Sequence, residues 1–433
     1  MSNAQKKIVR SWILYDWANS AFATTIMAAV LPEFYSSFAG ATLNKTTATS
    51  YWGYSNTIAM LIIAFTAPLL GAMADHSGAK KRYLRSFAFI GIAATALLIG
   101  TGRGMWVYAS LLYIFGRVGF GGANIFYDSL LPHVAGPKEI DKVSAQGYAY
   151  GYLGGGILLA VNLLMIMNPG LFGIPDAAWA SRISFLTVAV WWAVFSIPIF
   201  TNVPEPQAVV SPEESTRALV AGYQRLGRTF KDIKRFKELA VFLAAFLLYN
   251  DGVGTIIIMA VIFGAEIGIG STHLIGSILM VQFLGLPFTL LFGRIPKVLG
   301  TKNSILCALG VYLIVTILGY FMYKPAHFWI LAFLVSMVQG GTQALSRSMY
   351  GSMSPPAKSA EFFGFYNVSS KFAGIIGPAL FGIVGQITGT SRLSIVAVAV
   401  FFVAGGLILA TVDQTKGIQA ALIEEKEERT RAV

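Results

Sequence analysis

The chain has 433 residues, of which 55% are hydrophobic and 12% charged, and its formal net charge is +12. A soluble domain carries about 25% charged residues, so the composition excludes an ordinary soluble protein and indicates a membrane protein. In a soluble protein the positive charge would suggest nucleic-acid binding. Here we expect no nucleic-acid partner, because basic residues collect in the cytoplasmic connections of membrane proteins.

Twelve apolar stretches fill the chain, and each is long enough for a helix of about 20 residues that spans a bilayer. The predicted spans are 12–38, 51–74, 84–101, 105–131, 144–168, 181–200, 238–265, 272–293, 303–323, 327–352, 360–388 and 390–412. Lysine and arginine are dense in every second connection, as expected for an even number of spans with both termini in the cytoplasm. The sequence therefore predicts an all-α membrane protein with twelve transmembrane helices.

The longest hydrophilic stretch, 201–237, follows the sixth span. It begins with Pro204, Pro206 and Pro212 and continues with basic residues at helical spacing, which predicts an amphipathic helix on the membrane surface. The predicted parts are a six-helix bundle (1–200), a cytoplasmic linker with this helix (201–237), a second six-helix bundle (238–412) and a cytoplasmic tail (413–433). A regulatory role for the linker is an alternative that the sequence leaves open.

The two halves resemble each other at three places, in the same order. The matching segments are Leu14-Tyr15-Asp16 with Leu248-Tyr249-Asn250-Asp251, 71–80 with 293–302, and Gly121-Gly122-Ala123-Asn124 with Gly340-Gly341-Thr342-Gln343. Internal repeats of this kind are typical of membrane transporters. We therefore expect two six-helix pseudo-repeats.

The connection between the second and third spans reads Gly71-Ala-Met-Ala-Asp75-His-Ser-Gly78-Ala-Lys80-Lys81-Arg82. It resembles the signature loop of the major facilitator superfamily, Gly-x-x-x-Asp-(Arg/Lys)-x-Gly-(Arg/Lys)-(Arg/Lys), although His and Ala stand at two basic positions. Glycine allows a tight turn and a close helix approach. We expect Asp75 to cap the N-terminus of a neighbouring helix, and the basic cluster to pair with a carboxylate such as Asp128. The alternative is an ordinary basic loop.

Further segments carry the same resemblance. The segment 117–123 resembles the superfamily's helix 4 motif, and Gly147-x-x-x-Gly151-Tyr152-x-x-Gly155-Gly156 resembles its antiporter motif, with Tyr in place of the usual Pro. Small residues four apart also simply let helices approach. The segments 15–22, 346–349 and 361–366 resemble the vacuolar-effluxer-like branch, named for a yeast autophagy-related amino-acid effluxer. This resemblance implies a twelve-helix major facilitator fold and, loosely, amino-acid export.

Charged side chains within membrane spans are costly unless they face a cavity or a partner. The embedded charges here are Asp16, Glu33, Arg117, Asp128, Asp251, Arg347 and Lys371. Our hypothesis is that Arg117 and Lys371 hold an anionic group of the substrate, while Asp16 or Asp251 receives an ammonium group or carries a proton. The alternative is that these charges form interhelical pairs that only set packing or gate the two ends, and for Asp128 and Arg347 we favour this alternative.

Polar neighbours of these charges are candidates for the lining of a cavity. In the superfamily that the chain resembles, the first, fourth, seventh and tenth helices line the cavity. Asn19, Asn124 and Gln343 lie on three of these helices, and Tyr148, Tyr152 and Asn367 could contribute from the fifth and eleventh. The alternative for each is a packing role, since tyrosine is common at helix and membrane interfaces.

No constellation for enzymatic chemistry is present in the sequence. The four histidines have no metal-ligand spacing, and no glycine-rich phosphate loop with a lysine occurs. We therefore expect no metal, no cofactor and no enzymatic activity.

The favoured function is that of a secondary transporter working by alternating access, with its site between the halves. It would act as a monomer in a bacterial inner membrane, with both termini cytoplasmic, and export amino acids or related small amphipathic solutes, with a proton as candidate coupling ion. The alternatives are a lipid or lysolipid flippase on the same fold and a non-transporting receptor or scaffold.

Overall fold

The structure is a computed structural model that describes residues 2–206, 233–372 and 376–431. Within these ranges the chain is helical and contains no strand. Among the described residues, nine helical segments are long and apolar enough to cross a membrane. The other three predicted spans coincide with helical segments at 3–39, 106–129 and 359–388, of which 373–375 are not described.

The first half of the chain builds one helical bundle around its own core. Its helices are α1 (Asn3–Ala21), α2 (Val30–Phe34), α3 (Lys45–Ser77), α4 (Lys80–Leu97), α5 (Trp106–Ser129), α6 (Leu131–Val134), α7 (Ile140–Met167) and α8 (Ala177–Asn202). The core is aromatic at its centre, where Phe22, Phe120 and Trp192 contact one another. Apart from Ala360, the buried residues of this core come from 9–203.

The second half builds a separate bundle. Its helices are α10 (Lys237–Glu266), α11 (Ser271–Phe292), α12 (Pro296–Leu299), α13 (Thr301–Tyr320), α14 (Pro325–Met353), α15 (Ser359–Phe372), α16 (Ile376–Thr388), α17 (Ser391–Ala397), α18 (Ala399–Thr411) and α19 (Gln414–Arg431). The core of this half comes from 236–412. The amphipathic helix expected within 201–237 falls largely on 207–232, outside the described residues.

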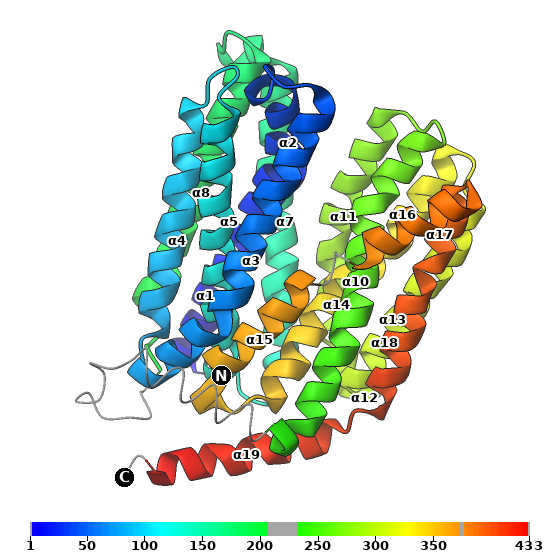
Figure 1. Cartoon of the computed structure of the whole chain (residues 1–433). Helices are drawn as coiled ribbons and strands as arrows, with labels where there is room; N and C mark the ends of the chain where they lie inside the picture. Colours follow the sequence, from blue (N-terminus) through cyan, green and yellow to red (C-terminus); the bar gives the residue numbers. More distant parts are fainter. Residues whose placement is uncertain (1, 207–232, 373–375, 432–433) are drawn as a thin grey trace.

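The two halves touch at the end of the molecule where both termini lie, and their ribbons diverge toward the other end (Figure 1). We call the first end the closed end. The contacts between the halves are made by α3 and α5 with α15, and by α7 with α11 and α14. The interface between the halves therefore includes α5, α14 and α15, which carry several of the embedded charges.

A glycine stripe on α7 explains how α1 packs against it. A Cβ added at Gly147 would lie 2.5 Å from the Asp16 carboxylate, one at Gly151 would lie 2.6 Å from Ser20 Oγ, and one at Gly155 would lie 2.9 Å from a Thr24 methyl. Small residues four apart allow such close helix approach. The segment that resembles an antiporter motif thus has a packing role in this structure.

The helix that begins with α1 is not regular along its length. Phe22–Ala29 and Tyr35–Ala39 are π-helical, on either side of α2. Thr24 in the first of these segments donates a hydrogen bond from its hydroxyl to the Gly155 carbonyl at 3.1 Å. Because π-helical turns occur frequently at functional sites, this irregularity indicates a functional site beside α1.

The C-terminal helix α19 runs across the closed end (Figure 1). Glu424 and Glu428 on α19 form ion pairs with Lys358, which precedes α15, and Glu424 and Glu427 pair with Arg235 just before α10. Acidic side chains of the tail thus join two segments that are far apart in sequence.

Candidate functional site

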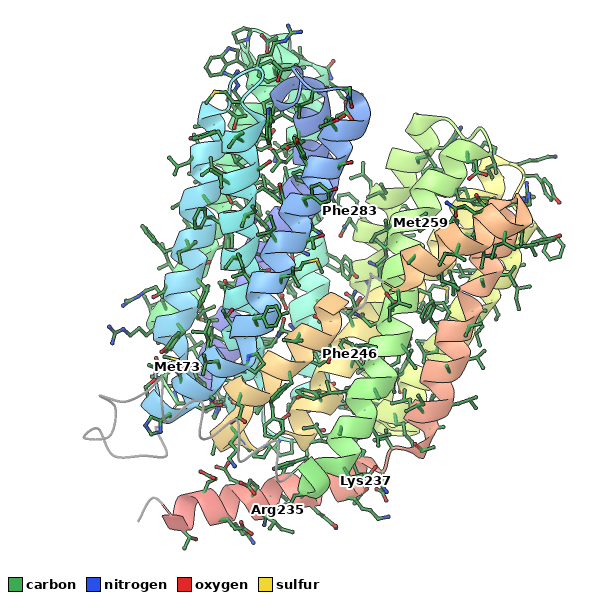
Figure 2. All side chains as sticks on the ribbon, in the orientation of Figure 1. Met73, Arg235, Lys237, Phe246, Met259 and Phe283 are labelled. Atoms are coloured by element: carbon green, nitrogen blue, oxygen red, sulfur yellow. The ribbon has the colours of Figure 1, made fainter. Side chains whose placement is uncertain are left out.

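A cavity of about 390 Å³ lies between the two halves. Its lining is half polar and comes from α1, the π-helical segment after it, α5, α7, α10, α11, α14 and α15. The lining residues are Asp16, Asn19, Ser20, Ala23, Thr24, Ala28, Phe120, Asn124, Tyr127, Asp128, Tyr148, Gly151, Tyr152, Phe246, Asn250, Gln282, Gln339, Gln343, Arg347, Tyr366, Asn367 and Ser370. Figure 2 shows Phe246 near the middle of the molecule, where its ring stacks on Tyr366.

Arg347 of α14 joins the two halves through two carboxylates. Its Nη1 lies 3.2 Å from Asp16 Oδ2 and 3.1 Å from Asp128 Oδ1. Its Nε donates to the Ser144 hydroxyl and its Nη2 to the Ser144 carbonyl, both at 2.9 Å. One guanidinium from the second half therefore bridges α1, α5 and α7 of the first. We call Asp16, Asp128, Ser144 and Arg347 the arginine cluster.

Aromatic rings and polar groups complete the surroundings of the arginine cluster. The Arg347 guanidinium lies 4.2 Å from the Tyr148 ring centroid and 4.9 Å from that of Trp12, in the range of cation–π attraction. The Tyr127 hydroxyl donates to Asp16 Oδ2 at 2.8 Å, and the Asn367 amide donates to Asp128 Oδ2 at 3.4 Å. The carboxylates, which are nearly buried, are thus held by several donors.

A second junction, which we call the Asp75 junction, links α3 to the start of α15. Asp75 Oδ1 accepts the Ala360 N–H at 3.1 Å, and its Oδ2 accepts the Glu361 N–H at 2.7 Å. Lys80 Nζ lies 2.9 Å from Asp75 Oδ1 and donates to the Ser359 hydroxyl at 2.6 Å. A carboxylate at a helix N-terminus is favourable because it meets free N–H groups and the positive end of the dipole.

The glycines of the signature loop fit the same junction. A Cβ at Gly71 would lie 2.2 Å from the Ala360 carbonyl oxygen, so only glycine allows α3 and α15 to approach this closely. Gly78 has φ of 59°, a left-handed conformation that ends α3 and suits glycine.

The expected pairing of the basic cluster with Asp128 is wrong in this structure. Lys80 pairs with Asp75, Lys81 donates from its backbone N–H to Glu205 Oε1 at 2.8 Å, and Arg82 is exposed. The physical reason is reach, because Asp128 faces the cavity and pairs with Arg347 there.

The structure divides the expected substrate residues into two groups. Asp16, Asn19, Asn124 and Gln343 line the cavity, and the Asn19 amide donates to the Asn124 side-chain oxygen at 2.7 Å. Arg117 and Asp251 are not among the lining residues, and the side chain of Lys371 is not described.

Each residue of the second group has a different position. Arg117 is buried within the first half and donates from Nη1 to the Met27 sulfur. Asp251 is buried on α10, one residue after the cavity residue Asn250. Lys371 belongs to α15, but its side chain lies outside the described residues.

Sequence reasoning missed Tyr127, Ser144, Gln282 and Ser370. Gln282 could have been found, because it is an amide in the middle of the otherwise apolar α11. Ser144 gave no signal, since its role depends on the position of Arg347 in the other half.

A second, apolar cavity of about 170 Å³ adjoins the first within the second half. Both are lined by Gln282 and Gln339. Apolar side chains such as Ile256, Met259 and Phe263 of α10 supply much of the remaining wall. The polar and apolar spaces therefore meet at two amide side chains. Within the described ranges, no group of three or more His, Cys, Asp or Glu residues is placed to hold a metal ion.

Known proteins resemble this chain in sequence and in fold. The uncharacterized MFS-type transporter YxiO of Bacillus subtilis (strain 168) is 37% identical over 406 residues, 93% of this chain and 94% of YxiO. Autophagy-related protein 22-1 of Penicillium rubens is 24% identical over 472 residues, 89% of this chain and 78% of that protein. The proton:xylose symporter XylE, solved with 6-bromo-6-deoxy-D-glucose, has a TM-score of 0.74 at 16% identity, with 98% of this chain and 99% of XylE covered.

The fold, with its cavity between two helical halves, is that of a transporter of the major facilitator superfamily. Within it, the chain belongs to the family described as vacuole effluxer Atg22 like, whose sequence model matches residues 4–422. The resemblance seen in the sequence is therefore confirmed, and YxiO and XylE are named as transporters rather than enzymes.

Proposed function

We propose that this transporter exports amino acids or related small amphipathic solutes by alternating access, with the substrate bound in the cavity between the halves. The proposal rests on one observation: a polar cavity and an apolar cavity meet at Gln282 and Gln339. The arginine cluster lies in the wall of the polar cavity. A solute with a charged end and an apolar end fits both spaces together.

The charges of the polar cavity favour an ammonium group. Asp16 and Asp128 supply two carboxylates against the single guanidinium of Arg347, and opposite charges attract strongly where water is scarce. The amides of Asn19, Asn124 and Gln343 can orient polar groups of the solute. For the anionic group, Lys371 and Arg117 remain our candidates, because both belong to helices that line the cavity.

Alternating access requires the closed end to open. In that movement the arginine cluster and the Asp75 junction must separate, because both hold residues of one half against the other. A proton on Asp16, Asp128 or Asp251 would remove a negative charge, and on the first two it would weaken the hold on Arg347. Proton coupling is the mechanism we favour for that reason.

We place the protein in a bacterial inner membrane as a monomer, with the closed end and both termini in the cytoplasm. The support is the concentration of basic residues in the connections at that end, which is typical of cytoplasmic loops.

The experiment is counterflow of labelled amino acids into proteoliposomes loaded with the same unlabelled amino acid. Uptake that saturates and is abolished in Asp16→Asn supports the proposal. Glu139→Gln is the matched control, since it removes a carboxylate at the closed end outside the cavity. If no amino acid exchanges but a fluorescent lysolipid is translocated, the flippase alternative replaces the proposal.

A further inference from the structure

A basic hollow lies between α1 and α8 at the closed end, on the side of the first half away from the cavity. Its lining residues are Asn3, Lys6, Lys7, Arg10, Ser11, Leu14, Pro198 and Asn202. The Asn202 amide donates to the Ser11 hydroxyl at 3.0 Å, which ties the two helices together beside the three cations. The hollow takes no part in the proposed transport site.

The three cations of this hollow have no acidic partner among the described residues. Lys6, Lys7 and Arg10 are exposed, and no carboxylate of the described ranges forms an ion pair with them. Val9 and Trp12 on another face of α1 are buried in the core, so the three cations point away from the core. Within the described part of the chain, nothing neutralises these charges, so they can attract an anion.

Aromatic and apolar side chains follow the hollow along α1 and α8. One turn beyond Leu14, the Trp17 ring stacks on Trp191 at 5.4 Å, and Trp191 lies 4.7 Å from the Phe195 ring. Trp191 and Phe195 also line a second hollow along α8, together with Leu158, Ile183, Leu186, Thr187, Val190 and Val194. This second hollow is almost wholly apolar.

The dimensions of the two hollows match one lipid leaflet. From Pro198 in the basic hollow to Thr187 in the apolar one is eleven residues of helix, or about 16 Å at 1.5 Å per residue. Half of the hydrocarbon core of a bilayer is about 15 Å thick. A basic surface followed by one leaflet's depth of apolar groove is complementary to a single phospholipid with an anionic headgroup.

We propose that an anionic phospholipid binds here, with its phosphate at Lys6, Lys7 and Arg10 and an acyl chain along α8. Each basic residue near an anionic membrane surface adds about fivefold to affinity. Because α1 also carries Asp16 and Asn19, the bound lipid would hold in place a helix that lines the cavity.

The test is native mass spectrometry of the purified full chain in detergent, titrated with phosphatidylglycerol or phosphatidylcholine of identical acyl chains. We expect at least about tenfold tighter binding of phosphatidylglycerol. The preference should disappear in Lys6→Gln/Lys7→Gln/Arg10→Gln, since glutamine keeps the helix but not the charge. The matched control is Lys138→Gln/Arg294→Gln/Lys297→Gln, which removes three exposed cations outside the hollow and should keep the preference.

The groove is tested separately with Val190→Trp, which fills it, against Val400→Trp, which adds the same bulk to an exposed position on α18. Only the first should weaken phosphatidylglycerol binding. Equal binding of both lipids by the wild type, or equal losses in the two triple variants, would overturn the proposal. Displacement of the lipid by millimolar glycerol 3-phosphate would also overturn it, because the site would then recognise a free anion and not a lipid.

Discussion

The arginine cluster and the Asp75 junction both hold the two halves together, but they do so with different groups. In the arginine cluster, a side-chain cation of the second half meets two carboxylates of the first, and three of its four residues line the cavity. In the Asp75 junction, the second half offers mainly the backbone N–H groups of α15, and no residue of the junction lines the cavity.

The difference separates a junction that a ligand can influence from one that it cannot reach. A substrate ammonium or a proton in the cavity can compete with Arg347 for Asp16 and Asp128. The Asp75 junction contributes closure alone, so its loss should change the balance between conformations and leave substrate recognition intact.

The largest effect is expected for Arg347→Ala. The change leaves Asp16 and Asp128 as buried carboxylates without their guanidinium, and loss of one partner of such a pair costs about 3–5 kcal/mol. Thermal unfolding in detergent measures the loss. Arg347→Lys should recover part of it, because lysine keeps the charge but cannot form the forked contacts. An Arg347→Ala protein as stable as the wild type would show that the cluster does not hold the halves together.

A smaller effect is expected for Asp75→Ala, which removes the cap of α15 at a cost of about 1–2 kcal/mol. Lys80 loses its ion pair but keeps the Ser359 hydroxyl and the Pro356 carbonyl as hydrogen-bond acceptors. The closed end should open more often. Labelling of Asn124→Cys by an impermeant thiol reagent from that side, in a Cys307→Ser background, reports the opening. Substrate affinity should change little. A large loss of affinity with unchanged labelling would show that the Asp75 junction, like the arginine cluster, takes part in substrate recognition.

Gly71→Ala tests the same junction through packing. The added Cβ would lie 2.2 Å from the Ala360 carbonyl oxygen, so α3 and α15 must separate, at a cost of about 1–3 kcal/mol. Gly136→Ala is the matched control, because nothing lies within 4 Å of its Cβ and it should be nearly neutral. The midpoints of thermal unfolding of the two variants give the comparison.

The smallest effect is expected at Asp413, before α19. The Lys416 N–H donates to Asp413 Oδ1 at 3.1 Å, and this bond lowers the pKa of the Asp413 carboxyl below its ordinary value. A lowered pKa stabilises the folded state above the ordinary pKa, and the stabilisation is lost only as the pH falls below about 4. The protection factors for hydrogen exchange in the first turn of α19, which correct for the intrinsic pH dependence of exchange, should be lower in Asp413→Ala than in the wild type at neutral pH. In the wild type they should change little between pH 7 and 5.

Much of the fold follows from local features of the sequence. The apolar stretches and the signature loop predicted helices and a superfamily that the relatives confirm. The pairing of Asp128 with Arg347, suggested by two opposite charges on helices expected to face each other, is present.

The remaining parts depend on packing between distant segments. Asp16 joins Arg347 only because the glycine stripe of α7 brings α1 within reach. The acidic tail has no apolar periodicity that predicts a docked helix, and α19 is held by cations from elsewhere, Lys358 and Arg235. Arg117 has the residue type for substrate binding but lies outside the cavity in this conformation.

The arginine cluster contains two carboxylates and one guanidinium, and this imbalance makes transport sensitive to the membrane potential. With both carboxylates ionised, the empty site carries a net charge of about −1 between the halves, and a charge moved through a membrane potential of 100 mV changes in energy by about 2.3 kcal/mol. An ammonium group or a proton in the cavity neutralises that charge. The step in which the empty carrier reorients should therefore depend on voltage, and the loaded step should not.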